Sequence, residues 1–391
     1  MLYYLMHADE PLTVLRIDDY GHLTKAGQIV PDPERMPLRH KALEKGLSRW
    51  WEERAVPFSR HGMAEFFEEH GYDGPEDYLV KNLGLSLTDQ YWIRPIDSNL
   101  SWKSINLYEN DFRAEQLDVS ETHNTNTVPS YSANSTLQGD IEKTWAIMDG
   151  RRILVKGNTD DLSSESLNEV FASEIYRLQG YDNYTSYQLL KIKGKDYDFG
   201  CFCTSFTSLE REFISAYDLV TSVRKPNDIS YFDHIVQLAV SGGAEEDQLH
   251  HDLDLMLLCD FILSGYDRHL NNVGLIRDPK TLRFIRMAPV FDSGGALFAG
   301  REMPSSRKEL LQVKTNSFAA SEQKLLTYVR NKKALDIDRL PLSDWVRKLY
   351  ERDHRQSEKR VMAVLSAYEQ KISILHMIQN GRDPFAKLYT K

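Results

Sequence analysis

The most informative part of this chain is Asp267-Arg-His-Leu-Asn-Asn272, together with Val290-Phe-Asp-Ser-Gly294. It combines a carboxylate at position 267, an amide at 272 and a second carboxylate at 292. Phosphoryl transfer from ATP uses this set, because one Asp orients the attacking hydroxyl and accepts its proton while an Asn and a second Asp hold Mg²⁺ against the phosphates. Oxygen ligands of this kind suit Mg²⁺. The spacing therefore predicts Asp267 as a catalytic base and Asn272 and Asp292 as magnesium ligands.

The neighbouring segments support this interpretation. Residues 255–263 form an apolar run with helical spacing that ends at Ser264-Gly265, directly before the loop. Two short strand-like segments follow, 273–276 and 283–286, joined by a turn at Asp278-Pro279-Lys280. The alternative is a polar surface loop with a structural Asp–Arg pair, and the second carboxylate with its flanking strands argues against that alternative.

Composition places the chain among ordinary globular proteins. Its 391 residues are enough for two domains or a bilobal one, and 41% hydrophobic and 27% charged residues are usual values. The net charge of −10 gives no support for a broad nucleic-acid-binding or anionic-membrane surface, so we expect no direct nucleic-acid contact. No apolar run approaches the ~20 residues of a membrane span, and the N-terminal sequence becomes acidic too soon for a signal peptide. The sparse Cys201, Cys203 and Cys259 lack zinc-type pairing and fit a reducing cytosol, so the expected location is cytoplasmic.

The pattern along the chain predicts three parts. Residues 1–125 are expected to form a mixed α/β module of unknown role, 126–206 a small β-rich lobe, and 207–391 a mainly helical lobe with the catalytic hairpin. A stretch rich in Ser, Thr and Asn, 119–140, is predicted to be a linker that passes into a mobile loop. The elements expected in the first part are strands at 11–17 and 87–95 and helices at 41–53, 62–71 and 77–83.

The tryptophan pair Trp50-Trp51 in the first part has two interpretations. Such large apolar side chains most often fill a core, and the less common alternative is a platform for a nucleic-acid base. We therefore expect core packing.

A β-hairpin is predicted in the second part. Two alternating β-prone runs, 143–148 and 151–156, flank Asp149-Gly150, a pair that favours a type I′ turn. Lys156 ends the second strand, where its ammonium group can bind the phosphates of ATP. A lysine at a strand end is more often solvated, but the order of hairpin, lysine, helix and catalytic loop favours a ligand.

A helix predicted at 167–178 supplies the partner of this lysine. Ser166 is its plausible N-cap, and Glu169 and Glu174 are both candidate carboxylates. The residues alone leave the choice between the two open.

Two further segments complete the predicted nucleotide site. Residues 135–143 carry one glycine, Gly139, and match neither phosphate-binding glycine motif, so they are a weak candidate for a flap over the phosphates. Residues 199–206 are predicted to be the strand and hinge beside adenine. There, backbone groups from Cys203 to Ser205 would bond to the base.

These residues resemble the HipA-like serine/threonine kinases of bacteria. The segment Asp267 to Asn272 fits their DxHxxN catalytic loop, and its Asp-Arg-His start also resembles that of phosphoinositide kinases. Gly139 to Thr144 is similar to their flap, Asn168-Glu169 to the helix after the lysine strand, and 288–292 to the approach to the metal-binding Asp. The resemblance covers roughly residues 130–300, the C-terminal helices loosely and the first 125 residues poorly.

The resemblance implies an α+β, bilobal protein-kinase-like fold with a β-rich N-lobe, a helical C-lobe and an extra N-terminal α/β module. It makes Lys156 a ligand of the ATP phosphates and favours Glu169 over Glu174 as its partner. It makes His269 a loop-organising residue and places the flap residues Gly139 and Lys143 at the nucleotide.

The same resemblance implies a regulatory site in the flap. The family can autophosphorylate a flap serine, which ejects the flap and silences the kinase. The nearest hydroxyls in this chain are Ser135 and Thr136, and the sequence leaves the choice between them open.

The expected function is an ATP- and Mg²⁺-dependent serine/threonine protein kinase. By resemblance it is a candidate toxin with a protein antitoxin and a translation factor as substrate, and any DNA contact would come through the partner. One alternative is a phosphotransferase that acts on a small molecule or a lipid headgroup. Another is a pseudokinase that binds nucleotide without transfer, and the intact set of charged residues argues against it.

Overall fold

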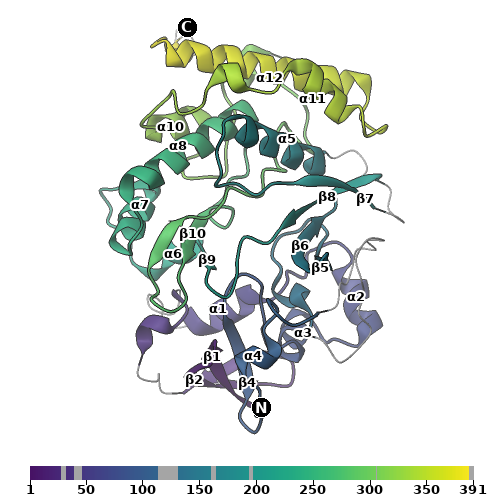
Figure 1. The fold of residues 1–391 in the computed structure, drawn as a ribbon, viewed down its shortest axis with the longest axis vertical. Helices are drawn as coiled ribbons and strands as arrows, with labels where there is room; N and C mark the ends of the chain where they lie inside the picture. The colour runs from purple at the N-terminus through teal and green to yellow at the C-terminus, as the bar shows by residue number, and fades with distance from the viewer. Residues whose placement is uncertain are drawn as a thin grey trace.

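The computed structural model describes residues 1–27, 32–38, 46–112, 131–159, 164–192, 197–304 and 306–386. The molecule is elongated, with an N-terminal α/β part at one end and the last long helices at the other (Figure 1). The described strands form three antiparallel sheets, with strand orders β3-β2-β1-β4, β5-β6-β8-β7 and β11-β10-β9. Most of the described helices lie in the C-terminal half of the chain, as expected for an α+β protein.

The first sheet and its helices form the N-terminal part. Their bounds are β1 (Leu2–His7), β2 (Glu10–Ile17), β3 (Leu23–Ala26), α1 (Gly46–Arg54), α2 (Met63–His70), α3 (Pro75–Lys81), β4 (Tyr91–Pro95) and α4 (Trp102–Ile105). The predicted strands and helices of this part are confirmed with shifted ends, although residues 41–45 of the first predicted helix lie outside the described residues. Strands β1 and β3 were not predicted.

The tryptophan pair fills the core of this part, as predicted. Trp51 is fully buried, and its indole Nε1–H donates to the carbonyl oxygen of Gly21 at 2.9 Å. Trp50 is buried beside it, with its ring edge-on to Tyr91 at 5.6 Å between centroids. The indole faces are therefore not available as a base-binding platform.

The second sheet contains the predicted hairpin. Strands β5 (Lys143–Met148) and β6 (Arg151–Lys156) pair from end to end, with Met148 opposite Arg151. Asp149 and Gly150 have φ of +50° and +73°, so both central residues are left-handed and the turn has the predicted type I′ character. Strands β7 (Gln188–Lys191) and β8 (Phe199–Thr204) complete this sheet.

Helix α5 (Glu165–Leu178) packs against β7 and β8 and begins earlier than expected. The prediction of Ser166 as its N-cap is wrong, because Ser166 lies within the first turn and its backbone N–H donates to the side chain of Asn158 at 3.0 Å. The side chain of Asn158, in the loop after β6, thus accepts a hydrogen bond from an N–H that has no partner within the first turn of the helix. Glu174 points away from Lys156 and pairs with Arg177 at 2.7 Å.

Residues 131–137 contradict the prediction of a mobile loop, and 113–130 lie outside the described residues. The turn Ala133–Thr136 is a buried 3-10 helix, and Ala133 and Leu137 belong to the same apolar core as the first sheet. Ser135 and Thr136 are both buried, and the hydroxyl of Thr136 donates to the carbonyl oxygen of Leu85 at 3.2 Å. In this conformation neither candidate acceptor hydroxyl is accessible to a phosphoryl donor. The prediction was wrong because tertiary contacts enclose a segment whose composition alone is that of a polar linker.

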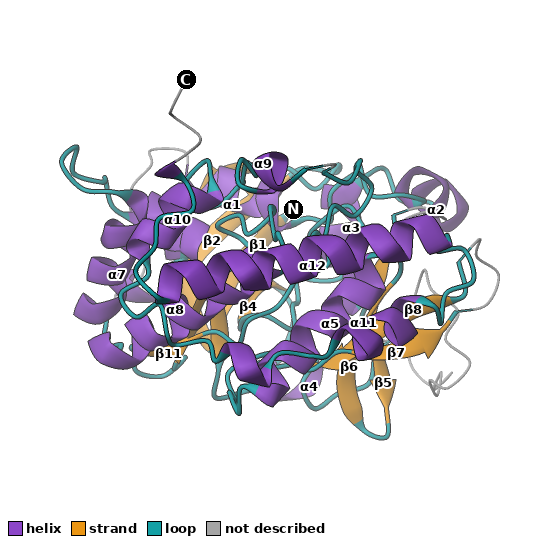
Figure 2. Ribbon diagram, turned by 90° about the horizontal axis from the view of Figure 1, so that it is seen from above, coloured by secondary structure: helices purple, strands orange, loops and turns teal. Residues whose placement is uncertain are grey.

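The third sheet and the remaining helices form the C-terminal half. Their bounds are β9 (Glu212–Ser215), α6 (Ala216–Ser222), α7 (Tyr231–Ser241), α8 (Glu246–Ile262), β10 (Gly274–Arg277), β11 (Phe284–Met287), α9 (Arg307–Leu310), α10 (Glu322–Tyr328), α11 (Ser343–Tyr350) and α12 (Glu358–Gln379). Helix α8 is buried along most of its length. Helix α12 contacts α8, and it also contacts α9 and α11 (Figure 2). None of the described helices is long and apolar enough to cross a lipid bilayer.

A buried charged network joins the first sheet to the third. Glu212 of β9 accepts from Arg277 of β10 at 2.7 Å and lies 2.8 Å from the Nε2 of His7 in β1. Arg277 also donates to the hydroxyl of Tyr91 in β4 at 3.1 Å. Burial alone would raise the pKa of Glu212, but the contacts with Arg277 and His7 lower that pKa to about 2. The carboxylate is therefore charged at neutral pH and holds two sheets together.

Candidate active site

The predicted catalytic loop lies between the end of α8 and the start of β10. Its backbone is held from both sides, since the N–H of Tyr217 donates to the oxygen of Leu270 at 3.0 Å and that of Asn272 donates to the oxygen of His269 at 2.8 Å. The side-chain Nδ2 of Asn272 also bonds to the backbone oxygen of Asp267 at 3.2 Å. The side chain of Asp267 remains partly exposed, whereas Asn272 is buried. The loop thus presents one carboxylate toward solvent above a fixed amide.

Arg268 connects this loop to the segment around Asp292. Its buried guanidinium forms a bidentate ion pair with Asp260 of α8 at 2.8 and 3.0 Å. It also donates to four groups in the two loops, the backbone oxygens of Asn272, Phe291 and Asp292 and the hydroxyl of Ser293. Because one nitrogen, Nη1, contacts the backbones of both Asn272 and Asp292, the two predicted magnesium ligands lie next to each other.

Lys156 lies between two carboxylates. Its Nζ is 2.6 Å from Oε1 of Glu169 and 2.6 Å from Oδ1 of Asp292. The other oxygen of Glu169 accepts from the backbone N–H of Ser293 at 2.9 Å. The end of β6, helix α5 and the segment after β11 therefore converge on one ammonium group, and of the two candidate partners it is Glu169 that binds Lys156.

The charges in this cluster stabilise each other. Burial alone would lower the pKa of Lys156, but Asp292 and Glu169 raise that pKa well above its ordinary value. Burial would also raise the pKa of Asp292, and the neighbouring Lys156 and Lys143 instead hold it well below its ordinary range. At Glu169 burial prevails over Lys156, and the pKa is raised. The more exposed of the two carboxylates, that of Asp292, is thus the one kept ionised most firmly.

The donor atoms of Asp292 and Asn272 are of the kind that bind a divalent cation. Asn272 uses its amide nitrogen on the backbone of Asp267, which leaves Oδ1 as the atom available to a metal. Asp292 adopts φ of +58°, a conformation uncommon for residues other than glycine, and such strain often occurs at ligand-binding positions. One carboxylate and one amide oxygen form a donor set that suits Mg²⁺.

The flap lies against the same charges. Lys143 is buried at the start of β5, and a Cβ on Gly139 would stand 2.6 Å from its Nζ. Gly139 also has φ of +93°, a backbone conformation that favours glycine at the tip of the flap. Burial lowers the pKa of Lys143 to about 8, with Asp292 opposing this effect and the positive charges of Lys156 and Arg60 adding to it. The structure thus brings Gly139, Lys143 and Lys156 to one place.

The strand register narrows the predicted hinge, the backbone from Cys203 to Ser205, to one residue. The N–H of Ser205 donates to the oxygen of Arg152 at 2.9 Å, and Cys203 pairs with Leu154 of the same strand. Along two antiparallel strands, residue pairs that exchange backbone hydrogen bonds alternate with pairs that do not. The backbone groups of Cys203 and Ser205 therefore face β6, and those of Thr204 face away from it. The partner on that other side, β7, pairs with β8 only as far as Phe202. The backbone groups open to a ligand are therefore those of Thr204.

Two polar residues at this site, Arg268 and Asn316, were not among the predicted site residues. Arg268 carries most of the loop-organising contacts expected of His269, whose Nδ1 receives one N–H, from Asn271 at 3.3 Å. Asn316, from a loop between α9 and α10, donates its Nδ2 to Oδ1 of Asp267 at 3.2 Å and its backbone N–H to Tyr266 at 2.6 Å. The signal for Arg268 was present in the Asp-Arg pair, but the sequence contains none for Asn316.

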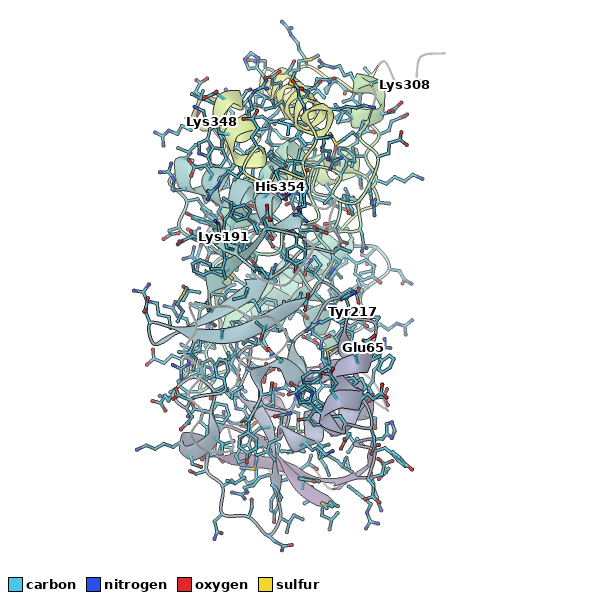
Figure 3. The ribbon with its side chains drawn as sticks, turned by 90° about the vertical axis from the view of Figure 1, so that its right-hand side faces the viewer. Glu65, Lys191, Tyr217, Lys308, Lys348 and His354 are labelled. Carbon is cyan, nitrogen blue, oxygen red and sulfur yellow. The ribbon has the colours of Figure 1, made fainter. Side chains whose placement is uncertain are left out.

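A separate polar cluster of two exposed residues and one buried residue lies outside this site. Asp198, Asp353 and His354 place possible metal-binding atoms within 4.8 Å of one another. Asp353 is engaged by Arg355 at 2.5 Å, and His354, which Figure 3 labels, pairs with Asp198 at 2.5 Å. These contacts are those of an ion-pair cluster, and we assign it no ligand.

Comparison with known proteins identifies the fold. No protein-family model matches the chain, and no curated protein matches it significantly. Among solved structures, HipA from Shewanella oneidensis MR-1, in a toxin–antitoxin complex with HipB and its operator DNA, matches with a TM-score of 0.53 at 11% identity. This match covers 97% of this chain and 98% of that one. The Helicobacter pylori proinflammatory kinase CtkA matches with a TM-score of 0.47 at 16% identity, over 61% of this chain and 92% of that one.

The likeness to HipA shows that the chain has the expected bilobal, HipA-like kinase fold. It extends over nearly the whole chain, so it includes the N-terminal module that the sequence resemblance reached poorly. At this identity the likeness shows the fold alone, and the match to CtkA is too loose to carry an argument.

Proposed function

We propose that this protein is a kinase that transfers the terminal phosphoryl group of ATP, with Mg²⁺, to a serine or threonine hydroxyl of another protein. The observation that carries the proposal is the convergence of the ion-paired Lys156 with Asp292 and Asn272 beside Asp267. This convergence unites segments from both halves of the chain, and a structural role for any one of them would not require it.

Each residue has one task in this proposal. Lys156 binds phosphate oxygens while Glu169 holds its ammonium group in place, and the backbone of Thr204 bonds to adenine. Asp292 and Asn272 hold Mg²⁺, which when bound neutralises charge on the phosphates. Asp267 orients the acceptor hydroxyl and accepts its proton.

The partners are proposed from the fold. Because the HipA structure contains HipB and operator DNA, we propose that this chain is also bound by a protein antitoxin and meets DNA through that partner. The net charge of −10 is consistent with the absence of a broad nucleic-acid surface on the chain itself. A translation factor as substrate and a cytoplasmic location remain predictions.

Transfer of label from γ-labelled ATP tests the proposal. We expect Mg²⁺-dependent label, removed by EDTA, on serine or threonine of an added protein pool. Label on small molecules or lipid headgroups alone would instead establish the other phosphotransferase. Nucleotide binding without any turnover, with Mg²⁺ or with Mn²⁺, would show a pseudokinase and overturn the proposed function.

Asn316→Ala is expected to lower kcat about fivefold and leave the KM for ATP unchanged, because it removes a hydrogen bond of ~1 kcal/mol from the base without touching the nucleotide site. Steady-state kinetics measure the effect. Lys308→Ala on α9, exposed in the same half of the molecule (Figure 3), is the control and should match the wild type. An unchanged kcat in Asn316→Ala would show that Asp267 does not depend on this contact.

A further inference from the structure

The flap is attached to the N-terminal part of the chain rather than to its own lobe alone. The segment from Arg54 to Arg60, which joins α1 to α2, lies along it. The contacts between the two are the backbone bond from Val56 to Ser135 (2.9 Å), the side-chain bonds from Gln138 to Arg54 (3.2 Å) and Ala55 (2.9 Å), the bond from Ser59 to Asp140 (2.7 Å), and the bonds from Arg60 to Leu137 and Gly139 (2.9 Å).

Arg60 is the central residue of this attachment. Its side chain is almost fully buried and donates to the backbone oxygens on both sides of Gln138, while Nη1 has no hydrogen-bond partner among the described residues. Burial lowers the pKa of Arg60 to about 10, and the negative charge of Asp140 opposes this effect. A buried cation that bonds only to backbone oxygens of one loop fixes the path of that loop.

The path of the loop determines where the nucleotide-facing residues lie. Arg60 bonds directly to Gly139, whose Cα lies against the ammonium group of Lys143. On the other side, Asn134 bonds to Thr144 and to the backbone of Trp145, so β5 is tied to the same turn. The flap tip at 138–140 is exposed, and without these bonds nothing in the described residues would hold it closed.

We propose that Arg60 is a positioning residue that holds the flap closed over the phosphates, so that the N-terminal part of the chain sets the affinity for ATP. The inference rests on the proposed function, because it assigns a role within the same nucleotide site. It gives the residues before 112 a direct part in nucleotide binding.

The test compares Arg60→Ala, Arg60→Lys and Gln138→Ala with the wild type, with Glu65→Ala on the exposed face of α2 as the control (Figure 3). Hydrogen exchange of the amides from 137 to 142 is measured without nucleotide, and KM for ATP and kcat are measured separately. In Arg60→Ala we expect exchange and KM to rise about tenfold, because bonds from a charged donor are lost, with kcat within about twofold of the wild type. Arg60→Lys should recover part of the effect.

Gln138→Ala keeps the inference testable if Arg60→Ala does not fold. Gln138 is exposed, so its replacement removes two flap contacts without opening a cavity, and a smaller rise in exchange and KM is expected. Unchanged exchange in both Arg60→Ala and Gln138→Ala would overturn the inference, whatever the activity of the protein. Faster exchange with an unchanged KM would overturn the link to ATP. A wild type without phosphoryl transfer but with exchange controlled by Arg60 would refute the proposed function and retain the attachment of the flap.

Discussion

Asp267→Asn is expected to reduce phosphoryl transfer about 100- to 10,000-fold, the usual contribution of a positioned proton acceptor. The amide has nearly the same shape as the carboxylate but cannot accept the hydroxyl proton. The side chain of Asp267 is partly exposed and accepts a hydrogen bond from Asn316, so the substitution should leave the fold intact. Initial rates at saturating ATP and Mg²⁺ measure the loss.

Two controls make this prediction specific. Asp344→Asn changes the same chemical group on the surface of α11, where the carboxylate is 70% exposed, and should retain wild-type activity. Nucleotide affinity of Asp267→Asn, measured by calorimetry, should stay within about threefold of the wild type, because Asp267 lies on the acceptor side in the proposed mechanism. Rates equal to the wild type would remove Asp267 from the chemistry and with it the proposed transfer step.

Arg268→Ala is expected to lower the free energy of unfolding by about 3–5 kcal/mol, because Asp260 would be left as a buried charge without its partner. Activity should fall to background as well, since the guanidinium bonds to the backbones of both Asn272 and Asp292. Arg268→Lys should recover little, because a single ammonium cannot replace a planar donor with several directed bonds. Urea denaturation measures the first effect and phosphoryl transfer the second.

A double substitution separates the two roles of Arg268. Replacing both Arg268 with Met and Asp260 with Leu removes the pair together, so we expect stability to return to within about 1–2 kcal/mol of the wild type. Activity should remain absent, since neither apolar side chain can hold the two loops. Arg339→Lys, at a surface ion pair, is the control and should change neither quantity. An active double variant would show that Arg268 serves the fold only.

The sequence predicted the features of the fold that depend on residues close together in the chain. The hairpin around Asp149-Gly150 follows from alternation and from two residues that tolerate positive φ. The burial of Trp50 and Trp51 follows from their size. The helix pattern limited the predicted partner of Lys156 to Glu169 or Glu174. The family resemblance favoured Glu169, and the structure places Glu169 against Lys156.

The parts that the sequence did not predict depend on contacts between distant segments. Ser135 and Thr136 belong to a polar stretch that has the composition of a linker, and contacts with α3 and β5 enclose them. Asn316 is 49 positions from Asp267, and no local pattern relates the two. The choice of Thr204 over Cys203 at the hinge depends on the register between β6 and β8, which residue types alone do not fix.

The buried charged network of Glu212, Arg277 and His7 predicts how a shortened form of this protein would behave. A fragment that starts at residue 126 would present to water a surface evolved for the interior, with Arg277 deprived of Tyr91 and Glu212 of His7. We therefore expect the excised portion from residue 126 to 391 to require the N-terminal portion, added in trans, for solubility.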